Sequence, residues 1–237
     1  MSDSNRQQFQ EELRQLEVSA LGGLQLVAGS LDRAIETVQQ RDIELASMVI
    51  ADDDRIDGRY LEVHQGILSL LALQAPVAGD LRLVAALLHV IKHVERMGDQ
   101  CVNMAKLVPL SGHEPPADEE LLGNLSRMGE LARSLVIQAG QAFERRDVGL
   151  AIDLVRQDDE IDSLNRASFH RALEIGDEPD RREWAMHMML VARCLERIGD
   201  NAVDIGEQTA FVVTGLFREF EDASHPELAP GLPGNTA

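Results

Sequence analysis

Apolar residues recur every three or four positions over long stretches of the chain, as in Leu13, Leu16, Ala20, Leu24, Val27 and Leu31. This spacing places their side chains on one face of an α-helix. The chain has 8 prolines in 237 residues. All of them lie outside the long periodic stretches, and proline breaks helices. The pattern therefore predicts helices over 5–40, 42–74, 77–108, 119–145, 147–174 and 180–220.

The segments between the predicted helices are short or polar. The step from Arg41 to Asp42 is expected to end one helix, with the Asp42 side chain capping the next. Residues 109–118 are rich in proline and acid and are expected to form a linker. Residues 221–237 have the composition of a disordered tail.

The two halves of the chain repeat one another. The pair Arg41-Asp42 recurs 105 residues later as Arg146-Asp147, and the segment ERMGD at 95–99 recurs 101 residues later as ERIGD at 196–200. The recurrence of these segments in the same order, with four residues lost from the second half between them, indicates a duplicated structural unit. The predicted fold is therefore all-α, with two pseudo-symmetric three-helix bundles at 5–108 and 119–220.

Acidic residues four positions apart share a helix face in both halves. They are Asp53 with Asp57 and Glu95 with Asp99 in the first half, and Asp158 with Asp162 and Glu196 with Asp200 in the second. Asn103 and Asp204 extend these faces by one turn. In an antiparallel hairpin, residues equidistant from the turn lie level. The acids of the first half are equidistant from Pro76 and those of the second from Pro179, so each set of four is expected to converge.

Level carboxylates on neighbouring helices suggest one metal site in each half. Four close carboxylates raise one another's pKa unless a cation is present, and oxygen ligands suit hard cations such as magnesium, manganese and iron. Gly98 and Gly199 also favour a close approach, because glycine inside a helix is otherwise unfavourable. A solvated acidic face is the alternative, but the symmetry about each turn favours metal. Zinc is not excluded as the bound ion.

Composition and charge narrow the function. The chain has one Trp, one Tyr, six Phe and a formal net charge of −19, which opposes binding to nucleic acid or anionic lipid. Two cysteines, Cys101 and Cys194, make no disulfide framework and are expected to be small buried hydrophobes. We expect no signal peptide, no membrane insertion and a cytoplasmic protein, peripheral to a membrane at most.

An enzyme of the ferritin-like di-iron class is the main rival interpretation. That class carries Glu-x-x-His on two helices, a pattern that this sequence lacks. His89 and His93 have metal-compatible spacing, but His93 lies off the acidic face and neither recurs in the second half. We expect packing or surface roles for both. The sequence has no nucleophile–base motif and no nucleotide fingerprint.

The chain resembles the PhoU family of phosphate-transport accessory regulators. The resemblance covers about residues 10–215, and its most specific segments are 53–57, 70–82, 95–99 and 196–200. The family is built as two pseudo-symmetric three-helix bundles, and some members bind multinuclear metal clusters through E/DxxxD motifs. By resemblance, metal binding falls on the eight paired acids, with Asn103 and Asp204 as weaker candidates. The second turn, at 174–182, departs from the family pattern.

The resemblance also implies partners. Family members work near the phosphate ABC transporter and a sensor histidine kinase, and repress the phosphate-starvation response when phosphate is plentiful. The expected partners are therefore the transporter's ATPase and the sensor kinase, and a homodimer is expected. Two hypotheses remain: a non-enzymatic, metal-binding regulator of phosphate homeostasis, and a metal-dependent helical enzyme with a polynuclear oxygen-ligand site.

Overall fold

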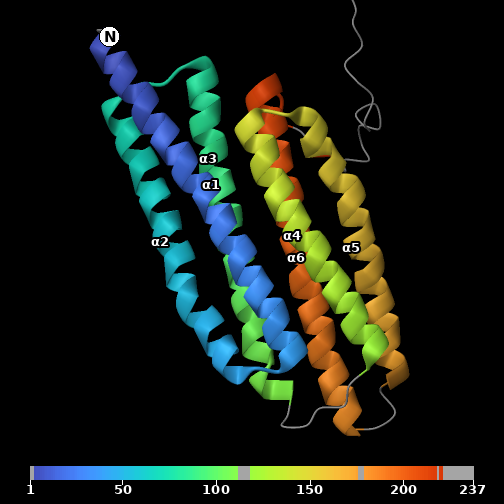
Figure 1. Ribbon diagram of the computed structural model, residues 1–237. Coiled ribbons are helices and arrows are strands. Elements are labelled where there is room, and N and C mark those ends of the chain that lie inside the picture. The colour runs from blue at the N-terminus through green and yellow to red at the C-terminus, as the bar shows by residue number, and fades with distance from the viewer. Residues whose placement is uncertain (1–2, 112–117, 176–178, 218, 221–237) are drawn as a thin grey trace, which may run out of the picture.

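The computed structural model describes residues 3–111, 118–175, 179–217 and 219–220. These residues form long α-helices with one short 3-10 helix and no strand. The helices are α1 (Asp3–Gln40), α2 (Ile43–Leu73), α3 (Ala78–Leu107), η1 (Pro109–Ser111), α4 (Glu119–Arg145), α5 (Val148–Ile175) and α6 (Pro179–Thr214). The all-α prediction is confirmed, and Figure 1 shows α1–α3 side by side with α4–α6.

The same turn begins the second helix of each half. Arg41 and Arg146 both adopt left-handed backbone conformations, with φ of 58° and 56°. The next residue caps the following helix: Asp42 Oδ1 accepts the Leu45 N–H at 2.9 Å, and Asp147 Oδ1 accepts the Leu150 N–H at 3.1 Å. The predicted Asp42 cap is therefore correct. The same capping hydrogen bond occurs at Asp147, which supports the internal duplication.

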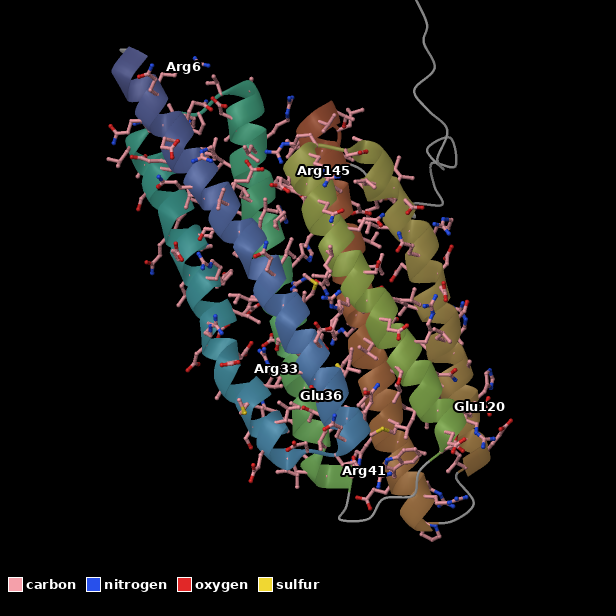
Figure 2. The ribbon with its side chains drawn as sticks, viewed as in Figure 1. Arg6, Arg33, Glu36, Arg41, Glu120 and Arg145 are labelled. Carbon is pink, nitrogen blue, oxygen red and sulfur yellow. The ribbon has the colours of Figure 1, made fainter. Side chains whose placement is uncertain are left out.

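The two bundles share one hydrophobic core. Within each half all three helices pack on one another, and between the halves α3 packs along α6 and α1 along α4. The buried apolar cluster runs through both halves, from Phe9 to Ile205. Figure 2 shows α1 descending from Arg6 to Arg41 and α4 rising from Glu120 to Arg145, so these two helices are antiparallel. The described helices include none that is both long and apolar enough to cross a bilayer.

The predicted end of the last helix at residue 220 is wrong. α6 ends at Thr214, because Gly215 takes a φ of 77° and donates its N–H to the Phe211 carbonyl at 2.8 Å. This is a left-handed glycine stop. The chain then turns back, and the Phe220 N–H donates to Glu207 Oε1 at 2.7 Å.

The predicted linker begins with an ordered turn. Pro109–Ser111 form η1, and Asp118 caps α4 by accepting the Leu121 N–H at 2.9 Å. The intervening residues 112–117, like the predicted tail at 221–237, lie outside the described residues.

Candidate metal centres

Helices α2 and α3 bring the four acids of the first half together. The pKa of Asp53 is raised to about 6, first by burial and then by the charges of Asp57, Asp99, Asp54 and Glu95. The pKa of Asp99 is also raised, by burial and then by Glu95 and Asp57. The carboxylates of α2 and α3 thus lie close enough to repel one another. This agrees with the expectation that the acids of the hairpin lie level.

Helices α5 and α6 build the corresponding site in the second half. The pKa of Glu196 is raised to about 6, first by burial and then by Asp200, with Asp162 adding to the rise and Arg193 opposing it. Glu196 is 8% exposed, and its buried Oε2 atom has no hydrogen-bond partner among the described residues. Asp158 is buried on the facing helix. A buried carboxylate oxygen without a partner is costly unless something neutralises it.

Glycine lets the two helices of each site approach closely. A Cβ atom at Gly98 would lie 3.0 Å from Asp53 Oδ1 and 3.0 Å from Ile56 Cγ2. At Gly199 a Cβ atom would collide with Asp158 Oδ1. The sequence-based expectation of close approach at these two glycines is therefore correct, and the neighbour in both cases is a candidate ligand.

A basic side chain accompanies each site and was missed from the sequence. Lys92 Nζ lies 2.7 Å from Glu95 Oε2, and its repeat counterpart Arg193 pairs with Glu196. The sequence signal was a basic residue three positions before each Glu-Arg-x-Gly-Asp segment. The second site has a further ion pair, between Arg166 and Asp162 at 3.5 Å.

The outer two candidates are placed differently from each other. Asn103 is exposed on α3. Asp204 Oδ2 lies 3.3 Å from His93 Nδ1, which is also 2.8 Å from Asn201 Oδ1. Asp204 therefore has a partner in the seam between α3 and α6. Burial lowers the pKa of His93, and this histidine has a packing and hydrogen-bonding place between the two halves.

The donor chemistry fits a hard cation, although the side chains do not surround one point. As placed, the described residues contain no group of three or more His, Cys, Asp or Glu side chains that could hold a metal ion. The donors are nonetheless oxygens with mutual repulsion, and Glu196 Oε2 has no hydrogen-bond partner within the described part of the chain. These are properties that a cation would relieve. Lys92 and Arg193 each engage one carboxylate oxygen, Glu95 Oε2 and Glu196 Oε1, and would compete with a cation for these glutamates.

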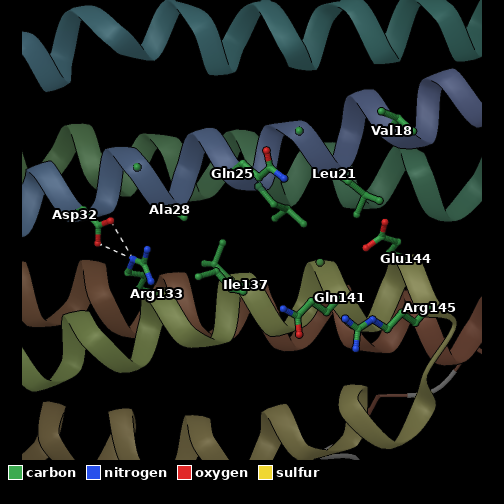
Figure 3. A pocket seen from close by; sticks show the side chains of 15 residues that line it. Val18, Leu21, Gln25, Ala28, Asp32, Arg133, Ile137, Gln141, Glu144 and Arg145 are labelled. Atoms are coloured by element: carbon green, nitrogen blue, oxygen red, sulfur yellow. Dashed lines mark hydrogen bonds and ion pairs between the residues drawn. The ribbon is translucent and has the colours of Figure 1, made fainter.

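The buried cysteines and the groove between α1 and α4 lie apart from the candidate metal ligands. Cys101 and Cys194 are buried, and burial raises their thiol pKa to about 12 and about 11. Such thiols are neutral and behave as small hydrophobes, as expected. A groove of about 720 Å³ lies between α1 and α4, and Figure 3 shows the Asp32–Arg133 ion pair across it. No candidate metal ligand lines this groove.

Comparisons with known proteins agree with the repeated architecture. The PhoU domain model matches the chain twice, at residues 24–108 and 125–209. A Mycobacterium tuberculosis protein named phosphate-specific transport system accessory protein PhoU homolog 2 is 31% identical, over 90% of this chain and 99% of its own length. A Caulobacter vibrioides PhoU homolog is 32% identical, over 91% of this chain and 94% of its own.

Solved structures of PhoU proteins also match this chain over most of its length. The crystal structure of the phosphate transport system regulatory protein PhoU from Streptococcus pneumoniae matches with a TM-score of 0.82 and 28% identity, over 89% of this chain and 99% of that one. PhoU from Pseudomonas aeruginosa also matches with a TM-score of 0.82, at 25% identity, over 88% and 100% of the two chains. With its two matched domains, its repeated helical hairpins and its relatives spanning nearly the whole sequence, the chain belongs to the PhoU family.

Proposed function

We propose that this chain is a non-enzymatic cytoplasmic regulator of phosphate homeostasis that restrains phosphate uptake and represses the phosphate-starvation response. The observation that carries the proposal is the presence of two PhoU domains in a chain that nearly coincides in extent with its relatives. Those relatives are named as accessory proteins of the phosphate-specific transport system. The neutral thiols and the absence of a nucleophile–base motif from the sequence fit a binding protein.

The proposed partners are the ATPase of a phosphate ABC transporter and a phosphate-sensing histidine kinase. Both act at the membrane, so the regulator would work as a peripheral protein, as a homodimer. A net charge of −19 would speed encounter with basic protein surfaces, and high salt would weaken this contribution to the association rate.

The proposed metal sites use the paired acids of each hairpin. In the first half these are Asp53, Asp57, Glu95 and Asp99, and in the second Asp158, Asp162, Glu196 and Asp200. A bound iron, manganese, zinc or magnesium ion would supply positive charge between the two helices. The carboxylates would stay ionised around it and hold the outer faces of the hairpins in one arrangement.

A reporter assay tests the regulatory role. The gene is deleted, and a phosphate-starvation reporter is measured with ample phosphate. We expect constitutive expression that wild-type protein represses fully, and that the double variant Asp99→Asn, Asp200→Asn represses poorly. An unchanged reporter in the deletion strain, with no second copy of the gene to compensate, would contradict regulation and favour a metal-dependent enzyme.

Elemental analysis tests the metal sites independently of the regulatory role. Protein purified without chelator is analysed for iron, manganese, zinc and magnesium, beside the same double variant. We expect bound metal in the wild type and its loss in the variant. Wild-type protein with no divalent cation above the buffer background, even after incubation with each metal, would rule the sites out.

A further inference from the structure

The groove of about 720 Å³ between α1 and α4 has walls that carry no charge over most of their length (Figure 3). Residues 18–31 of α1 and 134–143 of α4 contain no Asp, Glu, Lys or Arg. Val18 is nevertheless 58% exposed and Ile137 is 37% exposed. An open, uncharged and partly apolar surface on so acidic a chain suggests a contact with another polypeptide.

Two glycines of α1 line this groove where the fold itself leaves room for a side chain. A Cβ atom at Gly22 would have nothing within 4 Å, and a Cβ atom at Gly29 would meet Arg33 Nη1 at 3.8 Å, an ordinary contact. Glycine inside a helix is less favourable than alanine, and packing within the described chain does not account for these two. Both glycines would let a helix from outside approach α1 closely.

The exposed edge of α1 beside the groove carries opposite charges at its two ends. With about 3.6 residues per turn, five exposed side chains fall within about 20° of one line along the helix. They are Arg14, Val18, Gln25, Asp32 and Glu36. The line is basic at Arg14, uncharged through Gln25 and acidic at Asp32 and Glu36. A second, antiparallel copy of the same line would set a base against an acid at both ends.

We propose that α1 of a second copy of this chain occupies the groove, antiparallel to α1 of the first copy, with a two-fold axis at Gln25. This inference rests on the proposed function, which includes a homodimer, and it assigns the surface and the register of that dimer. Residues equally distant from Gln25 lie level, so Arg14 faces Glu36 of the other copy and Leu21 faces Gly29. The two-fold axis makes each pairing occur twice. The uncharged walls keep the acids of two chains of net charge −19 out of the contact.

Leucine substitutions at two open glycines test the groove. Gly22→Leu fills it, and Gly123→Leu is the matched control, because a Cβ atom at Gly123 also has nothing within 4 Å and Gly123 lies outside the groove. Sedimentation velocity of the full chain measures the dissociation constant of the dimer, after circular dichroism shows unchanged helix content. We expect Gly22→Leu to dimerise at least about tenfold more weakly and Gly123→Leu to dimerise like wild type.

Charge reversal tests the register. Arg14→Glu and Glu36→Arg each place like charges together at both ends, so each variant alone should dimerise about tenfold more weakly than wild type. A mixed dimer of the two variants again pairs opposite charges at both ends, so mixing them should restore dimerisation to near the wild-type level. Arg156→Glu, at an arginine of α5 with a 75% exposed side chain, is the control and should dimerise like wild type.

A cysteine at the axis identifies the occupant. Gln25→Cys should form a disulfide between two copies under mild oxidation, because Cys101 and Cys194 are buried and do not compete. Val18→Cys should not form one, since the two copies of residue 18 lie about 21 Å apart along the helix in this register. Equal crosslinking at both positions would overturn the antiparallel arrangement.

The outcomes separate the groove from the proposed function. If wild type dimerises and the Gly22, Arg14 and Glu36 variants dimerise equally well, the groove is overturned and the homodimer stands on another surface. A benzophenone amino acid at position 25 that crosslinks to residues 221–237 of its own chain, or to a different protein, also overturns the groove. If wild type stays monomeric, the groove and the proposed homodimer both fail, and the reporter assay still decides the regulatory role.

Discussion

Two glycines at equivalent positions control how closely the acidic helices approach. Gly199 faces Asp158 Oδ1 with no room for a Cβ atom, whereas nothing lies within 4 Å of a Cβ atom at Gly123 on α4. Glycine to alanine in an open helix stabilises by up to about 1 kcal/mol. We therefore expect Gly123→Ala to raise the free energy of unfolding and Gly199→Ala to lower it. Urea denaturation measures both, and equal stabilisation by both substitutions would contradict the tight contact.

The raised carboxyl pKa values predict an unusual pH dependence. The pKa of Asp53 and that of Glu196 are about 6 in the folded state, against about 3.9 and 4.3 for unfolded Asp and Glu. The folded protein therefore binds more protons between about pH 6 and pH 4, and its stability rises as the pH falls through this window. We expect the melting temperature of metal-free protein to be higher at pH 5 than at pH 7.

Amide variants separate this effect from the general relief of negative charge. Asp53→Asn with Glu196→Gln removes the two groups, and Glu36→Gln with Glu144→Gln removes two exposed acids instead. The first pair should reduce the rise in melting temperature between pH 7 and pH 5 more than the second. If both pairs keep the full wild-type rise, local repulsion at the two sites is not its source.

At the scale of the helices, capping aspartates set where each element begins. In the described ranges the Asp42 side chain makes only its cap to Leu45, whereas Asp118 caps α4 and also pairs with Arg171 of α5 at 2.7 Å. Loss of an aspartate cap costs about 1 kcal/mol. We expect Asp42→Ala to lower the free energy of unfolding by about this amount and Asp118→Ala to lower it by more. Equal losses in urea denaturation would show that the link between α4 and α5 contributes nothing.

The helices were predictable because the residues that begin and end them act locally. Pro76, the Asp42 cap and the repeat of Arg41-Asp42 define boundaries through interactions within a few residues of each end. The end of α6 was misplaced because Gly215 was not recognised as a stop. A single glycine in an apolar segment is ambiguous without knowledge of its φ.

The candidate sites were predictable as far as one hairpin determines them. Level acids about Pro76 follow from helix geometry, and close approach at Gly98 follows from the unfavourable free energy of a glycine inside a helix. The position of Asp204 beside His93 does not, because it depends on how α6 packs against α3 of the other half. The rotamers of Lys92 and Arg193, which hold Glu95 and Glu196, also could not be read from a repeating pattern.

At the scale of the whole molecule, one core carries two chemically unequal halves. The buried cluster is continuous, so the outer acidic faces contribute little to the packing that holds the fold. We expect the helical circular dichroism signal to survive addition of a chelator, because burial stabilises these long helices. Collapse of the signal on chelation would instead make metal a part of the folding free energy, as in zinc fingers.

The two candidate metal sites differ in their ion pairs, and this difference predicts different affinities for a cation. Among the residues that the structure describes, Arg193 pairs with Glu196 and Arg166 pairs with Asp162 in the second site, whereas the first site has one such pair, between Lys92 and Glu95. A resident guanidinium competes with a cation for carboxylate oxygens. In calorimetric titration with manganese, we therefore expect the tighter site to disappear in Asp99→Asn and the weaker site in Asp200→Asn. Arg193→Gln should tighten the second site, because Glu196 is then released without repacking the core. Equal affinities in wild type, or weaker binding in Arg193→Gln, would show that the arginines do not compete with the ion.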